Sequence, residues 1–280
     1  MRTPVSFFVG LIFLLTTFSA CNNETRKEED SKSSVPAIKE ENVSYTLDSV
    51  TMNGFVAFDS NATGKRPVVL IVHEWWGVND YVRNRAKQLA EMGYVAMAVD
   101  MYGNGKQAAD PKEALALAMP FYQNPQMAKN RLDAALNKVK EYGQADLSNV
   151  AAIGYCFGGA VVLNAARLGM DAKGVVSFHG SLLGAPANKD LMKAKVLVCH
   201  GGADNFIPQQ EIDQFKKQMD SINADYSFIT YDSATHAFTN PDATETGKKF
   251  NMPIEYNAGA DRKSWADMKQ FFDRIFVKNN

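Results

Sequence analysis

The sequence predicts an α/β fold in which helices cover both faces of a mostly parallel central sheet, with a hairpin at its N-terminal end. Short apolar runs alternate along the chain with longer stretches whose apolar residues recur at helical spacing. The apolar runs, such as residues 68–72, are continuous rather than alternating, which is typical of parallel strands buried on both faces. A chain of 280 residues with 46% hydrophobic content is long enough for one such domain.

The N-terminus is predicted to be a targeting segment rather than part of the fold. Residues 1–20 combine an early arginine with an apolar stretch that is too short to span a bilayer, as in a signal peptide. Residues 18–21, Phe-Ser-Ala-Cys, resemble the lipobox of bacterial lipoproteins. This implies a lipid on Cys21 and anchoring in the bacterial cell envelope, facing the periplasm or the cell surface. The alternative is ordinary cleavage after Ala20, which gives a soluble secreted protein.

The next segment, residues 21–42, is predicted to be a flexible tether. It is rich in Lys, Glu, Ser and Asn and contains few large apolar residues, so it cannot bury enough surface to fold. The folded domain is then expected to occupy residues 43–280. Its N-terminal hairpin is predicted over residues 43–60 with the turn at Asn53-Gly54, because Asn-Gly is a strong hairpin signal.

Caps, prolines and glycines set the expected bounds of the elements that follow. Asn79 is a good N-cap and Gly93 a good terminator, so a helix is predicted between them. Pro120 is expected to close the helix that begins at Pro111. The strands are predicted at residues 67–73, 94–99, 149–153, 174–178, 194–200 and 226–231. The helices are predicted at residues 80–90, 111–120, 127–142, 160–168, 208–222 and 260–277, and residues 239–258 are expected to be a loop.

Composition and charge exclude several classes of function. The formal net charge is −1 and the charged residues are interspersed, so no basic stripe is available for nucleic acid. The 3 cysteines are too few to build a disulfide framework. No glycine-rich loop leads into a helix-opening lysine, so a nucleotide site is not predicted. We expect neither a cofactor nor a metal ion.

Residues 154–159, Gly-Tyr-Cys-Phe-Gly-Gly, connect a predicted strand to a predicted helix. They fit the G-x-S-x-G turn, with Cys156 in the place of the nucleophilic serine. A strained nucleophile and close packing of strand on helix both favour glycine at Gly154 and Gly158. The N–H of Phe157 is then expected to face a developing oxyanion. The alternative is a buried, inert cysteine beside an ordinary glycine-rich turn.

An acid and a histidine follow Cys156 in the order nucleophile, acid, base. Asp204 lies just after the last predicted strand but one, and His236 follows the last strand. In this order His236 is the expected base, and Asp204 is the residue that orients its imidazole. Asp232 is a rival for the role of the acid. Three other histidines end strands and compete with His236, namely His73, His179 and His200.

Six short motifs extend the pattern over the chain. They are His-Glu-Trp-Trp-Gly at 73–77, Asp-Met-Tyr-Gly at 100–103, Gly-Tyr-Cys-Phe-Gly-Gly at 154–159, Ser-Phe-His-Gly at 177–180, His-Ala-Phe at 236–238 and Tyr-Asn-Ala at 256–258. As a set and in this order, they make the sequence similar to the dienelactone hydrolase family over residues 43–277. The resemblance implies the α/β-hydrolase fold.

The resemblance also implies roles for further residues. In the family, a glutamate at the position of Glu74 hydrogen-bonds the resting cysteine and takes part in its conversion to thiolate. Without such a role, Glu74 would be an exposed loop carboxylate or the partner of a nearby arginine. The N–H groups of Trp75 and Phe157 are expected to form the oxyanion hole. The substrate pocket is expected to include Trp76, Tyr102, His179 and Phe238.

The sequence departs from the family at two positions. Family members that act on dienelactone, a small anionic lactone, hold its carboxylate with arginines. Here Asn104 and Asn240 stand at the corresponding places, and an asparagine offers neither a charge nor a bidentate fork. The residues for hydrolysis are therefore expected to be present, but dienelactone is not the expected substrate.

The expected function is hydrolysis of a small ester or lactone, as by a carboxymethylenebutenolidase, through Cys156, His236 and Asp204. The expected partners are a small-molecule substrate and, through Cys21, a membrane. Two alternatives stay open. One is a cysteine-dependent amidase or peptidase. The other is a surface lipoprotein that binds a ligand without catalysis, although such a protein would not need the three residues together.

Overall fold

The computed structural model describes residues 1, 3–4, 6 and 35–276, and residues 35–276 form the fold. Cys21, most of the predicted signal peptide and most of the predicted tether lie outside the described residues. Within the part of the chain that is described, no helix is both long and apolar enough to cross a membrane.

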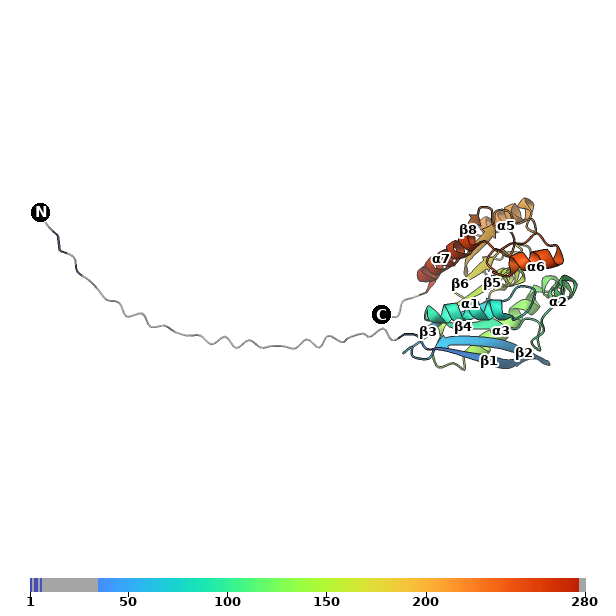
Figure 1. Ribbon diagram of the computed structural model, residues 1–280, viewed down its shortest axis with the longest axis horizontal. Helices are drawn as coiled ribbons and strands as arrows, with labels where there is room; N and C mark the ends of the chain where they lie inside the picture. The colour runs from blue at the N-terminus through green and yellow to red at the C-terminus, as the bar shows by residue number, and fades with distance from the viewer. Residues whose placement is uncertain (2, 5, 7–34, 277–280) are drawn as a thin grey trace. The chain divides into compact units, whose positions relative to one another are not determined.

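An eight-stranded sheet has the strand order β1-β2-β4-β3-β5-β6-β7-β8 (Figure 1). The pairs β1–β2 and β2–β4 are antiparallel, and every further pair of neighbours is parallel. The strands are β1 (Ile38–Leu47), β2 (Val50–Asp59), β3 (Arg66–Val72), β4 (Val95–Val99), β5 (Ala145–Tyr155), β6 (Gly174–Phe178), β7 (Lys195–Gly201) and β8 (Tyr226–Tyr231). The prediction of a mostly parallel sheet that begins with a hairpin is confirmed.

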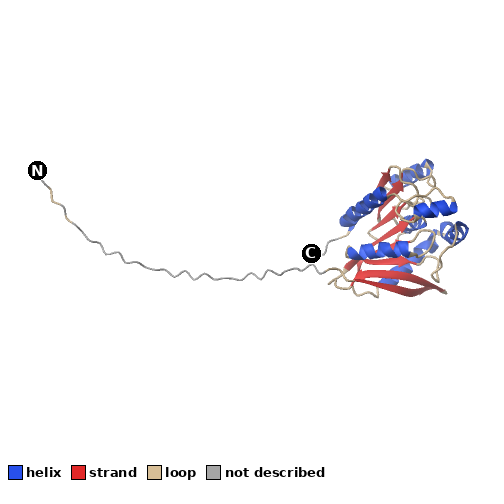
Figure 2. Ribbon diagram, in the orientation of Figure 1, coloured by secondary structure: helices blue, strands red, loops and turns tan. Residues whose placement is uncertain are grey.

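Helices cover both faces of this sheet (Figure 2). Those of the described residues are α1 (Asp80–Glu91), α2 (Pro111–Gln123), α3 (Pro125–Val139), α4 (Phe157–Arg167), α5 (Gln209–Ser221), α6 (Ala243–Phe250) and α7 (Ala258–Ile275). The helices α1 and α7 pack on one face, and α3, α4 and α5 pack on the other. Asn79 caps α1, as predicted, and its side chain accepts from the N–H of Val82.

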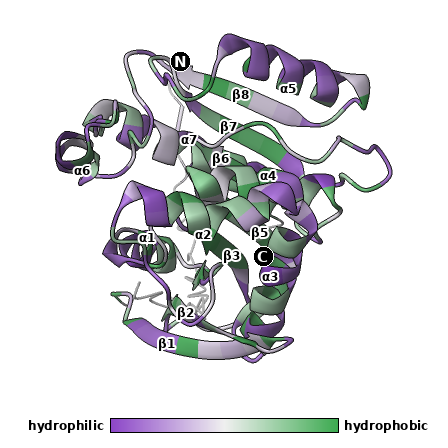
Figure 3. Ribbon diagram, turned by 90° about the vertical axis from the view of Figure 1, so that its right-hand side faces the viewer, coloured by the Kyte–Doolittle hydropathy of each residue, from purple (hydrophilic) through white to green (hydrophobic). Residues whose placement is uncertain are grey.

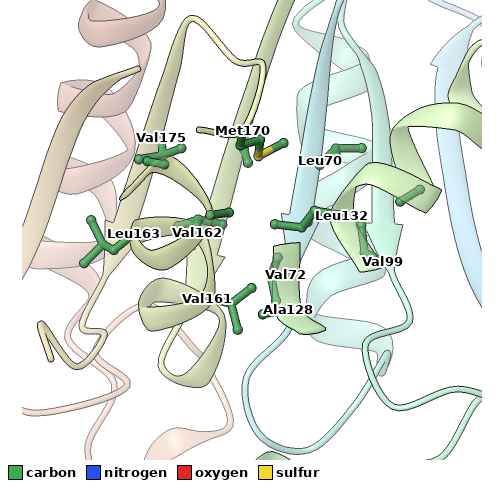
Figure 4. Packing of buried hydrophobic residues seen from close by; sticks show 14 of the residues in the cluster. Leu70, Val72, Val99, Ala128, Leu132, Val161, Val162, Leu163, Met170 and Val175 are labelled. Atoms are coloured by element: carbon green, nitrogen blue, oxygen red, sulfur yellow. The ribbon is translucent and has the colours of Figure 1, made fainter. Parts of the chain in front are cut away.

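The side chains of the parallel strands divide between two hydrophobic layers. Leu70 and Val72 of β3 lie in the layer that contains Leu132 of α3 (Figure 4). Val69 and Ile71 alternate with them and belong to the layer beneath α1 and α7. Figure 3 shows that the central strands are hydrophobic and that α5 is largely hydrophilic. Burial on both faces explains the continuous apolar runs of the sequence.

The hairpin turns at a different place from the predicted one. The connection lies at Asp48 and Ser49, and Asp48 has a φ of 54°, whereas Asn53 and Gly54 lie inside β2. A Cβ at Gly54 would lie 2.8 Å from the carbonyl oxygen of Ala98 in β4. The glycine therefore permits the close approach of two strands, and the prediction of a turn at this pair is wrong.

Several further bounds differ from the prediction, among them the start of β5 at Ala145 instead of residue 149 and the end of α3 at Val139 instead of residue 142. β1 begins at Ile38, before the expected domain start at residue 43, because backbone pairing with β2 holds a polar segment in the sheet. Pro120 does not close α2, which continues to Gln123, and the ring of Phe121 in its last turn lies 5.7 Å from that of Phe157. The expected loop at 239–258 contains α6, a helix of 8 residues that buries Ala243 and Gly247, and the prediction of a loop over this whole stretch is wrong.

Candidate active site

Cys156 occupies a strained turn between β5 and α4. Its backbone has φ 53° and ψ −114°, a conformation that side-chain-bearing residues seldom adopt. The flanking glycines make this turn possible. A Cβ at Gly154 would lie 2.0 Å from the carbonyl oxygen of Gly158, and one at Gly158 would lie 2.3 Å from the carbonyl oxygen of Val72. Only glycine fits these positions, so the turn follows from the local sequence.

Asp204 and His236 meet at the same edge of the sheet, because β7 and β8 are parallel neighbours that end side by side. His236 Nδ1 lies 2.8 Å from Asp204 Oδ2. The other carboxylate oxygen accepts the N–H of Phe206 at 2.9 Å, which fixes the orientation of the carboxylate. Asp232, the rival acid, is exposed in the turn after β8.

The surroundings of His236 favour its charged form. Burial opposes the positive charge, but attraction to Cys156 and hydrogen bonds with Asp204 and Cys156 together raise the pKa of His236 to about 10. A protonated imidazole beside the Cys156 side chain can hold a proton and later donate it to a reacting group. The arrangement can therefore supply a nucleophilic sulfur and a group that later returns the proton.

Two of the other histidines, His73 and His200, are buried at the ends of strands. Burial lowers the pKa of His73 to about 4, and its Nε2 accepts the N–H of Met101 at 3.4 Å. Burial also lowers the pKa of His200, whose ring lies 5.5 Å from that of Phe228. Neither of these histidines lines the pocket at Cys156.

His179 lies behind Cys156 and does not line the pocket. Its Nδ1 accepts the N–H of Cys156 at 3.1 Å, so its Nε2 carries the proton and donates to Thr239 Oγ1 at 2.7 Å. The hydroxyl of Thr239 also forms a hydrogen bond of 2.7 Å with the hydroxyl of Tyr81. Burial and the nearby His236 lower the pKa of His179 well below its usual value, which keeps it neutral. This chain connects the nucleophile turn to the loop that carries His236.

Two other predicted pocket residues are also buried away from the cavity. The Tyr102 hydroxyl donates to the carbonyl oxygen of Trp75 at 2.9 Å. Phe238 is fully buried, and its ring lies 5.2 Å from that of His179. Like His179, neither residue lines the pocket, since both belong to the hydrophobic layers beside the sheet. Of the predicted pocket residues, Trp76 does line it.

Two peptide N–H groups are available at the site. Phe157 is the first residue of α4, so its N–H has no partner within the helix. Trp75 lies in the loop after β3, and its carbonyl oxygen accepts the hydrogen bond from the Tyr102 hydroxyl. Among the described residues, no backbone acceptor is found for either N–H. Such free N–H groups can donate hydrogen bonds to an oxygen on which negative charge develops.

Glu74 is bound to Asn240. The Nδ2 of Asn240 donates to Glu74 Oε2 at 2.6 Å, and both residues line the same pocket as Cys156. Among the described residues, this is the hydrogen bond that the carboxylate makes, and none to the Cys156 sulfur is found. Burial raises the pKa of Glu74 to about 7, although the bond from Asn240 acts in the opposite direction. Asn104, the other departure from the family, is exposed and lies outside this pocket.

The pocket is a cavity of about 190 Å³, and Cys156 and His236 are among the residues that line it. Beside the predicted residues, its walls are formed by side chains that the sequence did not single out, namely Leu115, Tyr122, Ser181, Phe206, Ile207, Ala237, Ala243, Thr246, Met252 and Ile254. The nearest available signal was Phe206, a large apolar residue in the loop just after Asp204. No cluster of ligating side chains suited to a metal ion is found among the described residues.

A strained cysteine turn after a central parallel strand, with an acid and a histidine at the ends of the next strands, defines an α/β-hydrolase. Residues 52–276 match the model of the dienelactone hydrolase family, and the chain belongs to this family.

Similar proteins agree with this assignment. The chain is 30% identical over 187 residues to a "putative carboxymethylenebutenolidase" of Methylorubrum extorquens, covering 62% of this chain and 64% of that one. It is 27% identical over 230 residues to a protein of the same description from Yersinia pestis, covering 78% and 82%. A solved dienelactone hydrolase-like promiscuous phosphotriesterase from metagenomic libraries, P91, is 31% identical, with a TM-score of 0.80 over 86% of this chain and 100% of that one.

Proposed function

We propose that this protein hydrolyses a small ester or lactone through an acyl-thioester on Cys156. The observation that carries the proposal is that Cys156 and His236 line one pocket, and that His236 Nδ1 lies 2.8 Å from Asp204 Oδ2. Membership of a hydrolase family supports it.

The proposed reaction has two steps. The Cys156 thiolate attacks the substrate carbonyl carbon, and the N–H groups of Trp75 and Phe157 stabilise the oxyanion. The bond from carbon to the leaving oxygen then breaks, and His236 gives that oxygen its proton. In the second step His236 takes a proton from water, the hydroxide attacks the thioester, and the carbon–sulfur bond breaks to restore the thiolate. Asp204 holds the imidazole in one tautomer and stabilises its charged form throughout.

Glu74 is proposed to take part in switching Cys156 between thiol and thiolate. It lines the same pocket as the sulfur, and its pKa of about 7 lets it hold or release a proton near neutral pH. A charged carboxylate beside the sulfur opposes formation of the thiolate, whereas a neutral carboxyl group does not.

The test of the hydrolase proposal is to trap the acyl-enzyme. The protein is mixed with p-nitrophenyl acetate, quenched in acid during the first turnovers, digested and analysed by mass spectrometry. We expect one added acetyl group on the peptide that carries Cys156, because thioesters survive in acid. Turnover without any adduct on this peptide would contradict the proposed nucleophile. Absence of both turnover and adduct would instead favour the binding protein that the sequence left open.

We also propose that the mature protein is a lipid-anchored protein of the bacterial cell envelope, cleaved before Cys21. The support is the sequence of residues 1–21, with a charged start, a short apolar stretch and a lipobox-like end. The test is expression of the full chain in a bacterium with a labelled fatty acid. Label should appear in the protein and in the membrane fraction, and Cys21→Ser should remove both. Label that persists in this variant would contradict the proposal.

A further inference from the structure

We infer that the substrates of this site are neutral esters whose buried group is apolar and about the size of one aromatic ring, and that anionic substrates are disfavoured. The inference rests on the proposed hydrolase function and adds the class of substrate to it. Three features of the pocket support it, namely its charge, its volume and its mouth.

The charge of the pocket walls opposes an anion. No lysine or arginine is among the described residues that line the cavity, and Glu74 is the carboxylic acid among them. A positive charge on His236 is already paired with Asp204, whose Oδ2 lies 2.8 Å from His236 Nδ1. A carboxylate that enters the cavity would lose its water and find no free cation, while Glu74 would repel it whenever Glu74 is ionised. A neutral group meets neither cost.

The volume and the lining fit a compact apolar group. An apolar protein cavity of about 150 Å³ is known to bind benzene, and the cavity at Cys156 has about 190 Å³. Its walls are largely aliphatic and aromatic, with Trp76, Ile207, Met252 and Ile254 among them. Burying apolar surface gains roughly 25 cal/mol per Å², so a group of this size binds favourably. An aryl group or a short branched chain satisfies both conditions.

The mouth of the pocket continues the apolar surface. Leu115 and Tyr122 project from α2 and Phe206 from the loop after β7, and these three side chains remain 49%, 39% and 47% exposed. Large, partly exposed apolar side chains at a pocket entrance can contact the part of a ligand that lies outside the cavity. An ester with apolar groups on both sides of its carbonyl therefore matches the cavity and its entrance.

The closing experiment compares two esters of matched shape. p-Nitrophenyl 4-methylpentanoate and p-nitrophenyl hemisuccinate differ mainly in that an isopropyl group replaces a carboxylate. We expect kcat/KM to be higher for the neutral ester by on the order of 10²-fold, from the cost of placing an unpaired charge in the cavity. p-Nitrophenyl acetate is the reference. If p-nitrophenyl acetate is not hydrolysed, the hydrolase function itself is contradicted. If it is hydrolysed but the neutral and anionic esters react with equal kcat/KM, only the inference about the substrate class is overturned.

A pair of variants tests whether wall charge is the cause. Thr246 lies on α6, lines the pocket and is half-buried, so a longer side chain can extend from it to solvent. Thr246→Lys and Thr246→Met introduce chains of similar length that differ in charge. We expect the preference for the neutral ester to be about fivefold smaller in the lysine variant than in the methionine variant. Equal preferences in the two variants would show that charge does not set the selectivity.

Discussion

Replacing Cys156 by alanine is expected to lower kcat/KM for p-nitrophenyl acetate by at least about 10⁴-fold. The physical reason is that the sulfur forms the bond to the acyl group, so no other part of the site can replace it. The positive φ of Cys156 and the glycines around it are backbone features that alanine leaves in place. The measurement is steady-state hydrolysis, with circular dichroism to confirm that the variant is folded.

Cys199→Ala is the matched control, because it removes another thiol from the same sheet. Cys199 is buried in β7 and accepts a hydrogen bond from the Tyr231 hydroxyl at 3.5 Å. Burial raises the pKa of Cys199 to about 12, so this thiol stays protonated and unreactive. Hydrolysis should change little in this variant. If instead Cys156→Ala is fully active and Cys199→Ala is not, the proposed nucleophile is wrong.

Replacing Glu74 by glutamine is expected to stabilise the protein increasingly as the pH rises from about 4.5 to about 7, by about 3 kcal/mol over this interval. Burial gives Glu74 a higher pKa in the folded state than in the unfolded state. As the pH rises, the unfolded chain therefore releases the Glu74 proton at a lower pH than the folded protein does. The free energy of unfolding of the parent decreases between the two pKa values. Glutamine cannot ionise, and its side-chain oxygen can still accept the hydrogen bond from Asn240.

The measurement is the free energy of unfolding in urea, for the parent and the variant, at several pH values across this interval. Below this pH interval, the free energies of unfolding of the variant and the parent should differ little. Above it, the difference between them should be constant. Glu91→Gln, at an exposed position near the end of α1, is the control and should not show this pH-dependent difference. Parallel curves for the parent and Glu74→Gln would contradict the assignment of the buried proton to Glu74.

The convergence of Cys156, Asp204 and His236 could be predicted from the sequence because it depends on chain order and sheet topology. The carboxyl ends of parallel strands meet at one edge, so residues that follow strands in the right order come together. The nucleophile turn could be predicted for a similar reason, since its glycines respond to contacts with residues close by in the chain and in β3.

The walls of the pocket could not be predicted in this way. His179, Tyr102 and Phe238 belong to motifs near the site, but which face of a loop points into the cavity is decided by packing. The hydrogen bond from Cys156 to His179 depends on a left-handed backbone at His179, with φ 41°, that no sequence pattern announces. The Asn53-Gly54 error has a similar origin, because a glycine required by a neighbouring strand looks the same in sequence as one required by a turn.

The attachment of α6 has a consequence for how this protein can change over evolutionary time. The cluster of Ala237, Ala243 and Ile254 at this helix is small and separate from the two large layers beside the sheet. Substitutions on the pocket side of α6 therefore leave the two large layers intact, while they change the wall of the pocket. If this pocket binds the proposed substrate, descendants of this sequence can acquire new substrate preferences through mutations in one short helix, while the proposed catalytic residues and the sheet stay constant.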